Sequence, residues 1–213
     1  MMSKFEDEEE QELGKLAVRF ANAAVLPMVL KSALELNVID TIFASSGSSE
    51  GAFLSHAEIA SRLPAKNHDA PVLPDRMLRL LAGYDILKCS VRTGENGVVE
   101  RLYGAGPICK FLVKNEDGGS VATLLLLHQD KILMESWYHL NDVVLEGEVP
   151  FNRAYGMTSF EYPVTDQRFN QLFNQAMLNH TTLIMNNALY AYRGFQDLKV
   201  LLMWVVELML LLI

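Results

Sequence analysis

One β-hairpin pattern, set in a chain whose apolar residues otherwise recur at helical spacing, most constrains how this sequence can fold. The β-rich runs ILKCSVRT and GVVERLYGAG are joined by GENG, a turn typical of a hairpin. Apolar residues recur at three- and four-residue steps from Glu8 to about Ala44 and again in DRMLRLLAGYDIL, which indicates helices before the hairpin. Helix, helix, hairpin is the layout of a winged helix-turn-helix. We therefore predict a mainly α fold with one small β-hairpin in a winged-helix-like domain.

Cap and turn residues place further helices. Ser55 suits the N-cap of a short helix in LSHAEIASRL, and GPICKFLV reads as another short helix. The stretch GSVATLLLLHQDKILMESWYHLNDVVLEG is helical in pattern. One long helix is predicted from Thr165 to about Arg193, because Thr165 and Asp166 suit its first turn and Gly194 suits its C′ position.

Composition excludes several classes of function. The net charge of −8 argues against nucleic acid or anionic lipid as a main partner, since both need a basic surface. Cys89 and Cys109 are too few for a zinc site or a disulfide framework, and no histidine has partners at metal-ligand spacing. The leader MMSKFEDEEEQE is acidic and lacks the apolar core of a signal peptide, so we expect a cytoplasmic protein.

Four long strings carry a resemblance to a known family. MLRLLAGYDILKCSV, ERLYGAGPICKFLVKNEDGGS, HQDKILMESWYHLNDVVLEGEVPFNRAYGM and FNQAMLNHTT resemble the N-terminal part of plant S-adenosylmethionine-dependent O-methyltransferases of the caffeic acid type, over roughly Glu8 to Leu201. The resemblance implies a helical, winged-helix-like dimerisation domain that also lends walls to a phenolic pocket. It further implies that a separate Rossmann-like domain, missing here, binds S-adenosylmethionine and supplies the catalytic histidine.

The expected division of the chain follows from this resemblance. We predict a disordered acidic leader over residues 1–8, the winged-helix-like dimerisation domain over 9–120, and a helical segment with pocket walls over 121–194. Residues 195–213 would begin a truncated methyltransferase domain. No catalytic residue, cofactor-binding residue or metal site is expected in this chain. S-adenosylmethionine is the cofactor of the family, but none is expected to bind here.

The apolar tail FQDLKVLLMWVVELMLLLI allows three interpretations. A membrane anchor is disfavoured because the run contains Glu207 and falls short of the ~20 residues that a span requires. The second interpretation is a strand that is buried in the core. The third is an out-of-frame translation, since the family continues from this point into a strand and a glycine-rich turn, whereas no glycine follows Gly194.

The genetic code favours the third interpretation. Met203 and Trp204 each have a single codon, so the neighbouring frame must read valine across them and glycine after them. Permitted codons on either side extend this to Asp-Val-Gly-Gly-Gly-Ile-Asp, close to the cofactor-binding turn of the family. We therefore expect a one-base slip in the gene, transcript or gene reading from about Leu202 onward.

The resemblance also implies which residues contact the substrate. On the long helix they fall on one face at steps of four, four and three residues, a spacing that by itself would indicate only a core stripe. Planar phenols need flat, polarisable walls, which suits aromatic and methionine side chains. His128 and Pro163 depart from the asparagine and histidine common in caffeate-type enzymes, which leaves the phenol open, and His128 could equally be a surface histidine. The predicted substrate-contact residues are Leu127, His128, Leu133, Ser159, Pro163, Phe169, Phe173, Met177 and His180.

Three functions remain open at this level. The first is a truncated phenolic O-methyltransferase that pairs with itself or with full-length relatives but cannot transfer methyl alone. The second is an active O-methyltransferase of phenylpropanoid, lignin or flavonoid metabolism whose sequence was misread. The third, a winged-helix DNA-binding protein, is disfavoured by the acidic balance and by the lack of a Lys/Arg-rich recognition helix.

Overall fold

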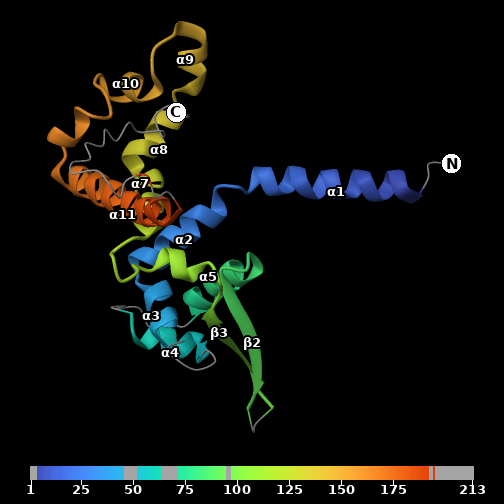
Figure 1. Cartoon of the computed structure of the whole chain (residues 1–213). Coiled ribbons are helices and arrows are strands. Elements are labelled where there is room, and N and C mark those ends of the chain that lie inside the picture. Colours follow the sequence, from blue (N-terminus) through green and yellow to red (C-terminus); the bar gives the residue numbers. More distant parts are fainter. Residues whose placement is uncertain (1–3, 46–51, 64–71, 95–96, 192–193, 195–213) are drawn as a thin grey trace. The chain divides into compact units, whose positions relative to one another are not determined.

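The computed structural model describes residues 4–45, 52–63, 72–94, 97–191 and 194, and it divides into two compact units. The first unit is Met1–Cys109 and the second is Lys110–Ile213 (Figure 1). The apolar tail over 195–213, with its expected change of frame, lies outside the described residues, as do Tyr192 and Arg193 at the predicted end of the long helix.

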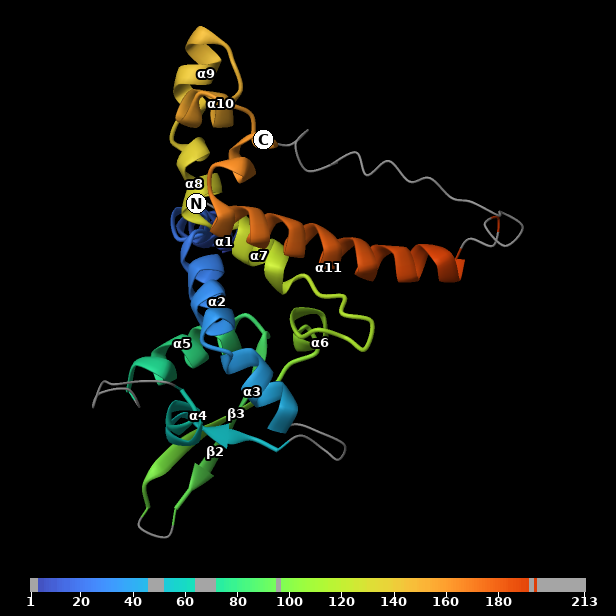
Figure 2. The same cartoon turned by 90° about the vertical axis from the view of Figure 1, so that its left-hand side faces the viewer.

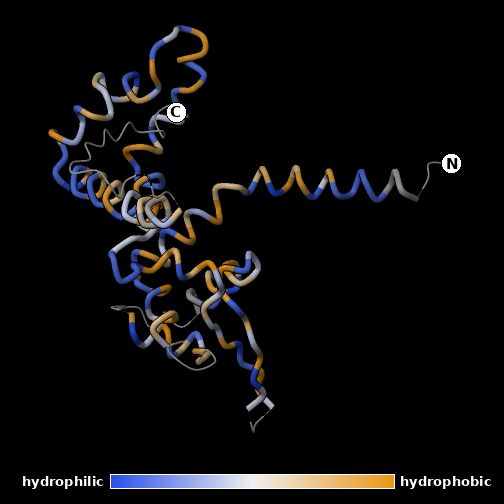
Figure 3. The backbone as a smooth tube through the Cα atoms, viewed as in Figure 1, coloured by the Kyte–Doolittle hydropathy of each residue, from blue (hydrophilic) through white to orange (hydrophobic). Residues whose placement is uncertain are grey.

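Three helices open the first unit: α1 (Lys4–Ala21), α2 (Val25–Glu35) and α3 (Val38–Ser45). Residues 4–8, which we expected in a disordered leader, belong to α1, since acidic residues are favourable near the positive end of a helix dipole. Figure 3 shows hydrophobic residues recurring along the half of α1 that is nearer to α2. Asn37 separates α2 from α3 with a left-handed φ of 56°, a conformation that asparagine tolerates better than most residues.

A short strand and two helices follow: β1 (Leu54–Ser55), α4 (His56–Ser61) and α5 (Val72–Gly83). The predicted cap at Ser55 is confirmed. Its hydroxyl accepts from the Glu58 N–H at 3.2 Å, and the Ser55 N–H donates to the Glu58 carboxylate at 2.7 Å. This reciprocal capping box fixes the start of α4.

The predicted hairpin is present as β2 (Leu87–Thr93) and β3 (Val99–Ala105), paired antiparallel with Cys89 opposite Tyr103. The sequence did not predict β1, which adds to β3 and makes a three-stranded sheet in the order β1-β3-β2. Beside this sheet lies a core of fully buried side chains. Its largest members are Ile39, Ile42, Ile59, Leu78, Leu81 and Tyr103.

The second half of the chain is helical: α6 (Cys109–Leu112), α7 (Ala122–His128), α8 (Lys131–Trp137), α9 (Leu140–Glu146), α10 (Pro150–Tyr155), a 3-10 turn (Tyr162–Val164) and α11 (Gln167–Ala191). The long helix is confirmed, and Asp166 caps it by accepting from the Phe169 N–H at 2.9 Å. In Figure 2, α7 lies along α11, and the two are in contact.

The helical pattern over 119–147 forms three helices, α7, α8 and α9. Asp130 causes the first break, because its side chain accepts from the Ile132 N–H and so begins α8 as an N-cap. The predicted fold class is confirmed: within the described residues the fold is mainly helical, with eleven α-helices and a small antiparallel sheet.

No single helix in the described ranges is long and apolar enough to cross a membrane. Two helical stretches, Glu8–Ala21 and Val25–Glu35, reach that length and composition only when taken together as a pair bent by 47°.

Candidate functional site

The predicted stripe on α11 lies partly in the core of the second unit. Phe169 is fully buried, whereas Phe173, Met177 and His180 are half-buried. Leu127 from α7 and Leu133 from α8 join Phe169 in one hydrophobic cluster, against which Phe173 and Met177 pack. The structure therefore brings five of the nine predicted residues together.

Rings from three consecutive elements extend this cluster. Tyr162 meets Phe169 edge-on at 5.6 Å and 85°, and it meets Phe151 edge-on at 5.6 Å and 84°. Tyr155 lies 4.8 Å from Phe151 and 4.6 Å from Tyr162, centroid to centroid. Such tilted and edge-to-face pairs stabilise one another beyond the area they bury, so α10, the 3-10 turn and α11 share one aromatic core.

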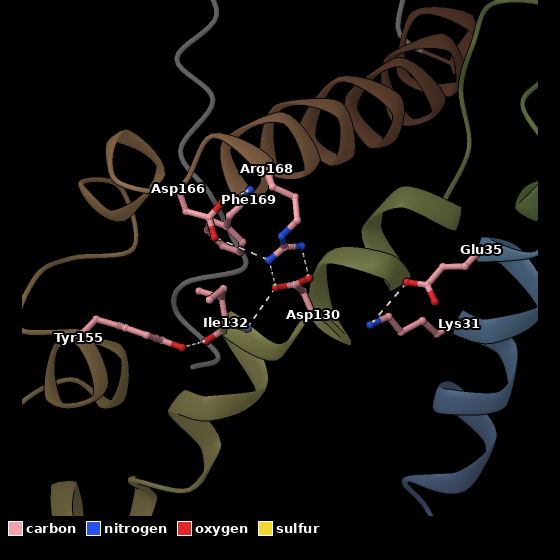
Figure 4. A network of polar contacts seen from close by, with 8 residues as sticks. All are labelled: Lys31, Glu35, Asp130, Ile132, Tyr155, Asp166, Arg168 and Phe169. Carbon is pink, nitrogen blue, oxygen red and sulfur yellow. Dashed lines mark hydrogen bonds and ion pairs between the residues drawn. The ribbon is translucent and has the colours of Figure 1, made fainter.

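A charged network ties the start of α11 to the start of α8 (Figure 4). The Arg168 guanidinium donates to both carboxylate oxygens of Asp130, at 2.6 and 3.0 Å, while Asp130 is 5% exposed. This hydrogen bonding raises the pKa of Arg168. Next to it, the Tyr155 hydroxyl donates to the Ile132 carbonyl at 3.0 Å, which ties α10 to α8. The two elements α8 and α11, which carry predicted pocket walls, are thereby fixed to one another, and α10 is fixed to α8.

A second polar seam holds α7 against α11. The side-chain amide of the buried Asn179 donates to the Thr123 hydroxyl at 3.1 Å, and the backbone carbonyl of Asn179 accepts from the Ser120 N–H at 3.3 Å. Gly119 permits this approach, because a Cβ there would lie 3.2 Å from the backbone of Leu183. Gly119 therefore serves close packing against α11.

The surroundings of His128 disfavour its charged form. Burial lowers the pKa of His128, and the charge of His180 lowers it further. His128 ends α7, at the break before α8, and is half-buried.

A cavity of about 240 Å³ lies beside the aromatic cluster, lined by residues of α8, α10 and the loop before the 3-10 turn. From the predicted set it takes Leu133 and Ser159, and Phe151 closes it on the side of the cluster. The Glu161 carboxylate shapes the loop by accepting from the N–H and the hydroxyl of Thr158, both at 2.8 Å. The last predicted residue, Pro163, is buried in the 3-10 turn.

Sequence reasoning missed Phe151, Tyr155 and Tyr162, and it missed the pair Asp130–Arg168. The spacing of four between Phe151 and Tyr155 in PFNRAY was a helical signal that could have identified the first two. The ion pair joins positions 38 residues apart, and no local pattern indicates it.

Within the described residues, no group of three or more histidine, cysteine or acidic side chains could hold a metal ion.

Comparison with known protein families gives a match for each half of the chain. The chain matches the O-methyltransferase dimerisation domain over residues 18–115 and the O-methyltransferase domain over residues 137–203. It is 57% identical to caffeic acid 3-O-methyltransferase of Catharanthus roseus over 191 residues, which cover 90% of this chain and 52% of that protein. It is 56% identical to esculetin O-methyltransferase of Kitagawia praeruptora over 193 residues, which cover 91% of this chain and 52% of that protein.

Solved structures show the same fold at low identity. Human N-acetylserotonin methyltransferase in complex with SAM matches with a TM-score of 0.65 at 20% identity, over 84% of this chain and 49% of that one. The mitomycin 7-O-methyltransferase MmcR matches with a TM-score of 0.63, over 89% and 50%. The chain thus spans about half the length of the relatives and structures that it matches.

Proposed function

This chain belongs to the plant O-methyltransferases of the caffeic acid type, and we propose that it forms the dimerisation and phenol-contacting part of such an enzyme. The observation that carries the proposal is the gathering of Leu127, Leu133, Phe169, Phe173 and Met177 in one cluster beside a small cavity. The family uses S-adenosylmethionine as its methyl donor.

The chemistry of the cluster supports a phenolic ligand. Its walls are aromatic rings and a methionine, which give flat and polarisable contact to a planar ring. The 240 Å³ cavity is just below the ~300 Å³ at which sites for drug-sized ligands begin, so it suits a single ring. The half-buried His128 and His180 would supply the polar groups that orient a hydroxyl.

Dimerisation is supported by the matched dimerisation domain and by α1. Leu13, Leu16 and Phe20 recur on one face of this helix and are 59%, 43% and 71% exposed. An apolar stripe of this kind is typical of a surface that a partner covers. We propose that the partner is a second copy of this chain or a full-length relative, in the cytoplasm.

The polypeptide of these 213 residues is proposed to transfer no methyl group by itself, because it contains neither the glycine turn nor the base of the family. The alternative is an active enzyme whose sequence changes frame by misreading. The methyltransferase-domain match ends at residue 203, next to the expected slip at Leu202. Resequencing the transcript across the codons for Lys199 to Ile213 separates the two: an uninterrupted frame restores the enzyme, and a confirmed slip leaves the non-catalytic subunit.

Calorimetric titration of the purified chain with caffeic acid tests the ligand proposal. Phe173→Ala and Met177→Ala should weaken binding, whereas Leu178→Ala, a neighbour that is 62% exposed on the same helix, should leave it unchanged. Equal affinity in all three variants would contradict the assignment of these walls. Methyl transfer by the unmodified polypeptide with S-adenosylmethionine present would contradict its proposed inactivity.

A further inference from the structure

A second and larger cavity, of about 670 Å³, lies in the first unit, where α5 packs on β2 of the hairpin. Four arginines line it: Arg76 and Arg79 from α5, Arg92 from β2 and Arg101 from β3. Among the described residues only two carboxylates, of Asp75 and Glu100, face the same space. The lining is therefore basic, although the chain carries a net charge of −8.

Both carboxylates already have partners. Asp75 accepts from the Tyr103 hydroxyl at 2.7 Å and pairs with Arg101 at 3.5 Å. Glu100 accepts from Arg92 across the hairpin at 2.7 Å. Within the described residues, Arg76 and Arg79 have no hydrogen bond or ion pair from their side chains, and both are exposed three residues apart on α5. Two guanidinium groups are thus left to face an incoming anion.

His56 gives an independent indication of a polar ligand. It lines the same cavity, and its Nδ1 is buried without a hydrogen-bond partner among the described residues. Buried polar atoms in folded proteins nearly always have a partner, and one without it beside a cavity indicates a group that the cavity receives.

We propose that this cavity binds a phosphate group, either free or on a small phosphorylated molecule. The guanidinium fork matches phosphate oxygens in geometry and charge, and the imidazole Nδ1 adds one more polar contact. The cavity volume is within the usual range of sites for small molecules. Asp75 and Glu100 beside the arginines disfavour a long polyanion, since a nucleic acid backbone would pass them at close range. No part of this inference depends on the phenol cluster of the second unit.

Calorimetric titration of the full chain tests the proposal, with inorganic phosphate and ribose 5-phosphate as separate probes. We expect saturable binding that Arg76→Gln/Arg79→Gln weakens at least about tenfold, since two charge-assisted hydrogen bonds are removed. His56→Phe, which keeps the ring shape and removes Nδ1, should also weaken it. Arg19→Gln, an exposed arginine on α1, is the matched control and should bind as the unmodified chain does.

The two probes distinguish the source of the phosphate. Tighter binding of ribose 5-phosphate identifies a phosphorylated small molecule, and equal binding identifies phosphate itself. The proposal is overturned if neither probe saturates, or if Arg19→Gln weakens binding as much as the double variant does. It is also overturned if a short DNA duplex binds in a salt-dependent manner while both phosphates fail, because the basic face would then be a nucleic acid contact.

Discussion

At the scale of single residues, the second unit combines buried aromatic side chains with half-buried histidines. The rings of Phe169 and Tyr162 are apolar and contact each other edge-on, so they contribute to the stability of the fold chiefly through packing. His128 differs because its charge state depends on pH and its surroundings disfavour the charged form. We therefore expect substitution of a buried ring to change the free energy of unfolding, and substitution of His128 to change how stability depends on pH.

The first prediction concerns packing at Phe169, which is fully buried. Phe169→Ala removes a ring from the middle of the cluster and should lower the free energy of unfolding by about 3–5 kcal/mol. Tyr190→Ala is the control, because that ring is 91% exposed on the same helix and should change stability by less than about 0.5 kcal/mol. Denaturant unfolding measures both, and similar losses in the two variants would show that Phe169 is not part of a rigid core.

The second prediction concerns pH. Because the folded-state pKa of His128 lies below the ordinary value of 6.5, this residue costs no stability above that pH, and its protonation destabilises the fold as the pH falls. His128→Asn should flatten the decline of stability below pH 6.5. His180→Asn should flatten it less, since burial is the larger cause of the shift and repulsion from His180 is the smaller. Melting temperatures measured across this range would contradict the assignment if His128→Asn kept the full decline.

At the scale of elements, α8 and α11 are held together by one ion pair as well as by apolar packing. Asp130 is nearly buried and also caps α8, whereas Arg168 is half exposed on the first turn of α11. A carboxylate of this kind requires its hydrogen bonds, because leaving a buried charge without compensation is costly. The pair therefore matters for the orientation of α11 more than a surface salt bridge would.

A double-mutant cycle tests this third prediction. Arg168→Met, Asp130→Asn and their combination should give a coupling energy of about 1–3 kcal/mol in the free energy of unfolding. The matched cycle on Arg153 and Glu146, two exposed residues that also form an ion pair, should give about 0–1 kcal/mol. Equal coupling in the two cycles would mean that the Asp130 pair acts as an ordinary surface contact.

The elements also show how far the sequence determines the fold. The hairpin, the cap at Ser55 and the start of α11 were predictable because each has a local chemical signal. The strand β1 was not, since two residues carry no periodicity. The breaks within residues 119–147 were not predicted, because polar residues such as HQDK also occur on the exposed face of a continuous helix. The stripe on α11 was predictable as one face, but its packing against Tyr162 depends on tertiary structure that no spacing encodes.

At the scale of the whole molecule, the feature that requires an explanation is α1. Every described side chain from Glu8 to Ala24 is exposed, although the helix carries an apolar face. Within a single copy, the described residues bury none of that face. A partner that covers α1 would account for the exposure, and Phe20 of this face lies within the dimerisation domain matched over residues 18–115.

The fourth prediction is that this face forms the dimer. Replacing Leu13, Leu16 and Phe20 together by serine should shift the sedimentation coefficient from that of a dimer to that of a monomer, because most of the apolar area available to the partner is removed. Val18→Ser is the control: Val18 is 61% exposed but lies on the opposite side of the helix, so the dimer should persist. A dimer that survives the triple substitution would place the interface elsewhere, and a monomer before any substitution would mean that α1 needs a full-length relative as its partner.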